Sequence, residues 1–269
     1  IGVGLVGSEM CIRDSPKEGL PMRSIRFSAL AAVMVSGSLL LSPIQAVNAD
    51  ELDEKRIGEI IEKVLMERPE IIVQALEAYQ AKQKLVEESR QKAQVVAQAD
   101  ALFTKADDPF VGNPNGAVTV VEFFDYRCGY CKRVHDDVMA LVNENDDVKV
   151  VYKEFPILGE ASMVAARISL AVNRVAPAKY GEFHTAVMKN RGSLSQDDLF
   201  ALAEQMGIDT GAVEREMASD DVMGIIRDNY RLAEALGIRG TPAFVVGDQI
   251  IPGAASKDAL NRLIEQSRG

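Results

Sequence analysis

The spacing of apolar residues predicts two helices in residues 51–106, a segment rich in Glu, Lys, Gln and Ala. Apolar residues first recur at the spacing of one helical face: Ile57, Ile60, Ile61, Val64 and Leu65. Pro69 suits the start of a second, long helix. The stripe continues along that helix at Ile72, Leu76 and Tyr79. A stripe this narrow gives an isolated helical segment too little apolar surface to bury. Residues 50–106 are therefore expected to associate with other copies of the chain, and a solvated spacer helix is the alternative.

The pattern changes after the turn-rich segment 107–116. Residues 117–126 are β-branched and aromatic and predict a buried strand, and residues 148–157 predict a second one. Between these two strands, a helix is expected from Cys128 to about Val142.

A helical block is expected over about 160–236. Ser195 and Asp209 have the character of helix N-caps, and Gly207 separates the helices they begin. Two short strands joined by a turn at Gly247-Asp248 follow, and an amphipathic helix closes the chain. The order β–α–β, helices, β–β–α predicts an α/β domain over residues 107–269.

The N-terminal residues have the pattern of a targeting segment. Met22 is followed by Arg23 and Arg26, an apolar stretch from Phe27 to Leu41, and small residues up to Ala49. This is the layout of a cleaved signal peptide over 22–49, and the apolar stretch is short for a membrane anchor, the alternative reading. Residues 1–21 are expected to be a non-native or read-through segment. A location in the periplasm follows from this reading.

Composition excludes some classes of function. The chain has 269 residues, 47% of them hydrophobic, which is enough for one core with an appendage or for two small domains. Its net charge of −10 makes it a poor partner for nucleic acid, because phosphate binding needs a basic surface.

Two cysteines, Cys128 and Cys131, carry the candidate chemistry. A disulfide between them would close a very short loop and add little stability, which disfavours a structural role. A zinc site needs about four ligands. Beyond residue 49 only His135 and His184 accompany the two cysteines. His135 lies one helical turn after Cys131, and His184 is expected to be an ordinary histidine on a helix surface or in the core. We therefore expect no metal and no cofactor.

A reactive pair accounts best for the position of Cys128. At the first turn of a helix, unpaired backbone N–H groups and the positive end of the helix dipole favour a thiolate. An ordinary thiol with a pKa of about 8.5 is only about 3% ionised at pH 7, so stabilisation of the anion matters. Cys128 is the expected nucleophile, and Cys131, one turn deeper, is the expected resolving thiol that releases the substrate.

The motifs "EFFDYRCGYC" and, much later, "GTPAF" resemble the DsbA-like branch of the thioredoxin superfamily. The likeness covers about residues 108–266 and implies a thioredoxin fold with a helical insertion. It also implies a cis peptide before Pro242 and a substrate-binding role for Thr241, Pro242 and the Gly129-Tyr130 pair; a trans proline at the start of a strand is the alternative. A substrate segment would pair with the Thr241 backbone like an added strand.

Glu122 interrupts a strand that is otherwise apolar. An unpaired buried carboxylate is costly, unless the side chain reaches water at an edge. The resembled family has a buried acid six residues before its first cysteine, which implies that Glu122 transfers protons to and from the resolving thiol. Lys153, in the next strand, is a possible charge partner.

The arm sequence "ERPEIIVQALEAYQAKQ" resembles the N-terminal domain of ScsC-type proteins, of which some are trimers that shuffle disulfides and others are monomers. The Gly-Tyr dipeptide and the Thr before the proline resemble disulfide isomerases more than strong oxidases. The resemblance implies an oligomeric isomerase or reductase that acts on cysteine-containing client proteins and exchanges electrons with a membrane thiol:disulfide redox partner. A monomeric dithiol oxidase, a copper(I)-binding tolerance protein and a helical scaffold with incidental cysteines are the alternatives.

Overall fold

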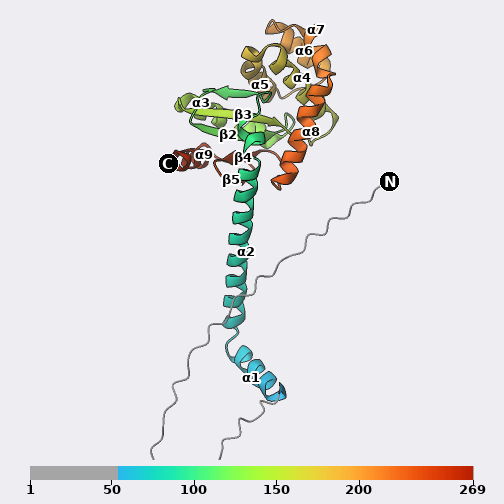
Figure 1. Ribbon diagram of the computed structural model, residues 1–269. Coiled ribbons are helices and arrows are strands. Elements are labelled where there is room, and N and C mark those ends of the chain that lie inside the picture. Colours follow the sequence, from blue (N-terminus) through green and yellow to red (C-terminus); the bar gives the residue numbers. More distant parts are fainter. Residues whose placement is uncertain (1–53, 269) are drawn as a thin grey trace, which may run out of the picture. The chain divides into compact units, whose positions relative to one another are not determined.

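The computed structural model describes residues 54–268. The predicted signal peptide and the segment before it lie outside the described residues. The helices and strands follow in this order (Figure 1): α1 (Glu54–Glu67), α2 (Glu70–Ala97), the π-helix η1 (Asp100–Thr104), β1 (Phe110–Gly112), β2 (Val118–Phe124), α3 (Gly129–Glu144), β3 (Val148–Glu154), α4 (Glu160–Val175), the 3-10 helix η2 (Pro177–Lys179), α5 (Tyr180–Lys189), α6 (Gln196–Gln205), α7 (Thr210–Met217), α8 (Asp220–Ala235), β4 (Ala243–Val246), β5 (Gln249–Pro252) and α9 (Lys257–Ser267).

Five strands form one mixed sheet in the order β1-β3-β2-β4-β5. β2 and β3 are parallel and joined by α3, while β1, β4 and β5 run antiparallel to their neighbours. This β–α–β unit followed by a β–β–α unit is the thioredoxin fold, and α4 to α8 form the predicted helical insertion between the two units. The fold class expected from the sequence is confirmed.

β2 and β3 are buried almost throughout, because hydrophobic side chains cover both faces of the sheet. On one face, Val120 and Phe124 pack against α3, α9 and the insertion helices. On the other face, Val121 and Phe123 pack against α8 and the segment that leads into β1. Residues alternate between faces along a strand. Even-numbered and odd-numbered residues of β2 therefore place their side chains on opposite faces of the sheet.

The segment that leads into the sheet is part of the second core. Val95, at the end of α2, and Leu102, in η1, are buried with Phe123 and Leu232. Lys92 of α2 also forms an ion pair with Asp248 beside β5, with 3.1 Å between Nζ and Oδ2. The last turns of the N-terminal arm thus pack as part of the α/β domain.

The apolar stripe predicted on the arm is present and exposed. On α1, Ile57, Ile60, Ile61 and Val64 are 38–53% exposed, and no residue of this helix is buried. On α2 the exposed apolar side chains include Ile72, Leu76 and Tyr79. The break at Pro69 between the two helices also lies where the sequence predicts it.

Several local predictions are confirmed, and one element was missed. The Ser195 hydroxyl accepts a hydrogen bond from the Asp198 amide, and the Asp209 carboxylate accepts one from the Ala212 amide, so both residues cap helices. The missed element is β1, which lies inside the segment that was expected to be only a turn. Its three residues form a short edge strand beside β3. Among the described residues, no helix has the length and apolar character needed to cross a membrane.

Candidate active site

Cys128 is the N-cap residue of α3, directly after the loop that leaves β2. Phe124 ends the strand, and the carboxylate of Asp125 then fixes the loop. Its Oδ1 accepts hydrogen bonds from the Arg127 amide at 2.7 Å and the Ser162 hydroxyl at 2.8 Å, and its Oδ2 accepts one from the Leu158 amide at 3.0 Å. The sequence analysis missed this role of Asp125, although an aspartate just before a turn is a recognisable signal.

The Cys128 sulfur is set up to be an anion. Its pKa is lowered to about 5, first by a hydrogen bond from the Cys131 thiol and then by the Thr241 side chain and the backbone of Cys131 and Tyr130. No backbone N–H makes a full capping hydrogen bond to the side chain. The N–H groups of Tyr130 and Cys131 still point toward the sulfur at the positive end of the helix and help to lower its pKa. The predicted position of Cys128 at the start of a helix is confirmed.

Cys131 is in the opposite state. Its side chain is fully buried, one turn into α3, and its pKa is raised far above the ordinary value by burial, by the hydrogen bond to Cys128 and by the charge of Glu122. The two cysteines are not bonded to each other. At neutral pH the Cys128 sulfur is therefore ionised, although the residue is only 6% exposed, while Cys131 keeps its proton.

Glu122 lies on the same face of the sheet as Cys131. It is 1% exposed, and its Oε1 has no hydrogen-bond partner. Burial, and secondly the negative charge of Cys128, raise its pKa to about 8. A carboxyl with that pKa exchanges protons near neutral pH, which suits the proton-transfer role that the resemblance implies.

The segment before β4 lies beside the cysteine pair. The Thr241–Pro242 peptide bond is cis, as the resemblance implies. The carbonyl oxygen of Thr241 is 3.2 Å from the Cys128 sulfur and accepts a hydrogen bond from the protonated thiol. Next to it, a pocket with a volume of about 350 Å³ is lined by Ile238, Pro242, Ile250 and residues around them. The two predicted halves of the site, more than a hundred residues apart in sequence, are thus brought together.

The residues between the two cysteines face solvent. Gly129 and Tyr130 are exposed, and the Arg133 guanidinium lies 4.9 Å from the centre of the Tyr130 ring. An exposed aromatic ring next to a reactive sulfur is available to a substrate segment. A substrate-binding role for Gly129 and Tyr130 stays a prediction.

Residues 119–265 match the family model described as the DSBA-like thioredoxin domain. The match covers more than half of the chain. This protein belongs to the DsbA-like thioredoxin family.

Two further comparisons agree with the DsbA-like assignment. A thioredoxin-like oxidoreductase from Silicibacter pomeroyi DSS-3 is 41% identical, with a TM-score of 0.60, over 63% of this chain and 96% of that one. Proteus mirabilis ScsC in a compact conformation is 28% identical, with a TM-score of 0.60, over 80% of this chain and 98% of that one. The protein is accordingly a thiol-disulfide oxidoreductase of the DsbA and ScsC type.

Curated relatives include both small proteins and larger ones. Disulfide bond formation protein D of Bacillus subtilis is 24% identical over 168 residues, which is 59% of this chain and 76% of that protein. The Na(+)/H(+) antiporter NhaA 3 of Salinispora tropica is 25% identical over 233 residues, but the chain spans only 34% of its length. The second likeness therefore concerns one part of the antiporter.

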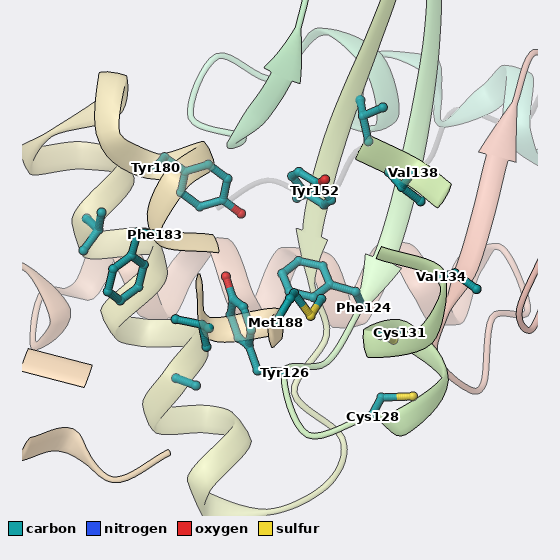
Figure 2. Close-up of a cluster of buried hydrophobic side chains, with 14 of the residues drawn as sticks. Phe124, Tyr126, Cys128, Cys131, Val134, Val138, Tyr152, Tyr180, Phe183 and Met188 are labelled. Atoms are coloured by element: carbon teal, nitrogen blue, oxygen red, sulfur yellow. The ribbon is translucent and has the colours of Figure 1, made fainter. Parts of the chain in front are cut away.

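The DsbA-like domain also contains a buried polar cluster that the sequence analysis did not predict. One member, Tyr126, lies among the buried hydrophobic side chains near Cys128 and Cys131 (Figure 2). The Tyr126 hydroxyl lies 2.5 Å from the Ser169 hydroxyl and 2.9 Å from Nδ1 of His184. The His184 ring packs on Tyr152, and burial lowers the pKa of His184 well below its usual value. Of the two ordinary environments expected for His184, the structure has the core one, where the imidazole is neutral. No group of three or more His, Cys, Asp or Glu side chains within residues 54–268 is arranged to hold a metal ion.

The expected pairing of Glu122 with Lys153 is wrong. Lys153 sits on the other face of the sheet, where its ammonium group binds the carboxylate of Asp108 and, at 2.6 Å, the carbonyl oxygen of Ala101. In the register of the sheet Glu122 faces Tyr152, so the next residue along β3 points away from it. Glu122 is left without a cation, which is consistent with its raised pKa.

We expect the reactivity of Cys128 to follow its lowered pKa. The rate of alkylation by a neutral reagent should rise with pH along a titration curve whose midpoint is about 5. The ultraviolet absorbance of the thiolate, followed in the reduced wild type, where Cys131 keeps its proton, provides an independent midpoint. A midpoint in the range of a free cysteine would contradict the thiolate assignment.

Proposed function

We propose that the protein works in the periplasm as an oligomeric thiol:disulfide isomerase or reductase for proteins with non-native disulfides. Cys128 attacks a client disulfide, forms a mixed disulfide and releases one client sulfur as a thiolate. A client thiolate then displaces Cys128, which completes an isomerisation. Alternatively, Cys131 displaces the client, which leaves a Cys128–Cys131 disulfide and two reduced client thiols.

The low pKa of Cys128 fits an isomerase, which attacks its clients from the dithiol form. Stabilising the thiolate favours the dithiol over the disulfide, and it also makes the disulfide a stronger oxidant, so this feature is shared with the competing dithiol oxidase. An isomerase ends each catalytic cycle with both thiols reduced, whereas a reductase must receive two electrons for each turnover. We infer that a membrane thiol:disulfide partner provides these electrons.

The exposed apolar stripe on α1 is the main observation that supports an oligomer. Four apolar side chains at helical spacing are 38–53% exposed, so covering the remaining surface of each would contribute roughly half of the 1.5–3 kcal/mol that burial of a fully exposed side chain gives. Several active sites held together would grip one misfolded client at more than one point. Monomeric dithiol oxidation is the competing function.

The test uses the full chain and a matched pair of variants. Ile60→Lys/Ile61→Lys places two charges on the stripe, and Glu59→Lys makes the same change in net charge on the opposite side of α1. We expect the wild type and Glu59→Lys to have a multiple of the single-chain mass by light scattering and to restore activity to scrambled ribonuclease. The double variant should have the single-chain mass, lose most isomerase activity and still reduce insulin. A wild type with the single-chain mass and no ribonuclease rescue would contradict the proposal and favour the oxidase.

A further inference from the structure

The rim of the active site is basic, although the chain as a whole is acidic. Five cationic side chains lie on the segments that meet near Cys128: Arg127, Lys132 and Arg133 in the neighbouring sequence, Arg191 next to the Asn190 carbonyl that Lys132 binds, and Arg239 two residues before Thr241. Four of them are exposed and Lys132 is partly buried. Within residues 54–268 none of the five forms an ion pair with a carboxylate, whereas Lys and Arg elsewhere often do.

Hydrogen bonds and a ring contact fix the first three of these side chains near the start of α3. The Arg127 guanidinium donates a hydrogen bond to the carbonyl of Leu158 at 3.0 Å, and Arg133 lies over the Tyr130 ring. The Lys132 ammonium binds the carbonyl of Asn190, which brings the loop after α5 to the first turn of α3.

Arg191 and Arg239 complete the rim from the two other sides. Arg191 is close enough to lower the pKa of Lys132, after the effect of burial. Arg239 lines the pocket beside Thr241 and Pro242. The two segments thus approach Cys128 from the insertion and from the turn before β4.

The nearby acids do not neutralise this rim. Asp136 on α3 pairs with Lys189, at 3.1 Å between Oδ1 and Nζ. Glu234 lines a hollow together with Arg231 and Arg239 and forms no ion pair with Arg239 in the described part of the chain. Glu122 and Asp125 are buried beneath the surface.

The cations are not the main cause of the reactive thiolate. The largest contributions to the low pKa of Cys128 are hydrogen bonds from Cys131, Thr241 and the helix backbone. Like charges such as Lys132 and Arg191 repel each other, so the rim has an unfavourable self-energy that a negatively charged partner would relieve. A charged rim around a reaction centre also concentrates oppositely charged partners.

We propose that this rim selects client disulfides whose reacting cysteine is flanked by acidic residues. The inference rests on the proposed function and specifies its substrates. Carboxylates on either side of the client sulfur would meet Arg191 on one side and Arg239 on the other as the segment docks along Thr241. The Cys128 thiolate forms a bond to the client sulfur, the client S–S bond breaks, and the departing sulfur leaves as a thiolate that is protonated by solvent.

Peptide disulfides of matched sequence test this proposal. Each peptide carries one cysteine joined to a chromogenic thiol, with flanking residues that are acidic (Asp, Glu), neutral (Asn, Gln) or basic (Lys). We expect reduced protein to react roughly tenfold faster with the acidic peptide than with the neutral one at low salt, and more slowly with the basic peptide. The difference should shrink at high ionic strength, because salt screens exposed charges.

Two double variants separate the rim from net charge. Arg191→Gln/Arg239→Gln should reduce the ratio of acidic to neutral rates to about two or less. Arg215→Gln/Arg262→Gln removes the same charge from α7 and α9, and it should keep the wild-type ratio. α9 approaches the far end of α3, where Lys257 binds Glu144, so Arg262 is remote from the sulfur. The Cys128 titration midpoint is measured in every variant.

Equal rates for the three peptides, or a ratio that survives in the rim variant, would overturn the selection by charge while leaving the thiol chemistry intact. Failure of every peptide to react would instead overturn the proposed function, and this inference with it. A changed ratio accompanied by an unchanged Cys128 midpoint would support the rim as a binding surface rather than as a source of reactivity.

Discussion

Cys131→Ser protein is expected to remain covalently joined to its clients through Cys128, whereas the wild type releases them. The reason is the division of roles between the two sulfurs. Cys128 is ionised and attacks, while Cys131 is the second thiol in the described residues and lies one turn away, where it resolves the mixed disulfide. Serine cannot displace a sulfur, so the intermediate should rise from a trace species to the main form of the protein. Non-reducing electrophoresis and intact-mass measurement with a scrambled client give its amount.

The control is the other single substitution. Cys128→Ser should form no mixed disulfide and show no exchange above the buffer rate, because the remaining thiol is buried and holds its proton. A Cys131→Ser protein that releases clients as fast as the wild type would contradict the assignment of Cys131 as the resolving thiol. Far-ultraviolet circular dichroism of both variants verifies that each one is folded.

The free energy of unfolding of the wild type is expected to fall as pH rises, and the Glu122→Gln variant is expected not to show this fall. The folded carboxyl has a pKa of about 8 against an ordinary value of 4.5, so between these pH values the folded state holds a proton that the unfolded state has lost. Stability therefore falls by about 1.4 kcal/mol per pH unit in this window, or about 5 kcal/mol in total from this group. The neutral amide does not titrate and carries no such loss.

Urea unfolding of the reduced proteins measures the effect. At pH 4.5 the two proteins should have similar free energies of unfolding, and at pH 8 the variant should be more stable by several kcal/mol. Subtraction of the two pH profiles removes most of the opposite contribution of Cys128, whose low folded pKa stabilises the reduced protein as pH rises, and leaves its charge coupling to Glu122. Glu182→Gln, the same change at an exposed carboxyl of α5, should follow the wild-type profile. A Glu122→Gln profile parallel to the wild type would show that the carboxyl is already ionised in the folded state.

Local chemistry made much of the fold and site predictable from sequence. The apolar runs of β2 and β3, the caps at Ser195 and Asp209 and the placement of Cys128 at the head of a helix all depend on neighbours in the chain. Their physical cause is visible in a window of a few residues. The cis bond before Pro242 is different, because only the resemblance favoured it over the trans form.

Contacts between distant segments could not be predicted in this way. Lys153 was expected near Glu122 because both are charged residues in adjacent strands, but a shift of one residue along a strand moves a side chain to the other face. Its true partner, Asp108, precedes a strand too short to be recognised. The Tyr126, Ser169 and His184 cluster joins three segments whose sequences give no sign of one another.

The anchoring of the arm on the second core affects how a catalytic fragment should be cut. A fragment starting at residue 107, where the turn-rich segment suggests a boundary, would discard Val95 and Leu102 and expose the apolar surface of Phe123 and Leu232. It would also lack the Ala101 carbonyl oxygen, which accepts a hydrogen bond from the buried ammonium group of Lys153. Trimming in the exposed middle of α2, ahead of Val95, preserves both contacts, and crystallisation or nuclear magnetic resonance samples of the isolated redox domain should begin there.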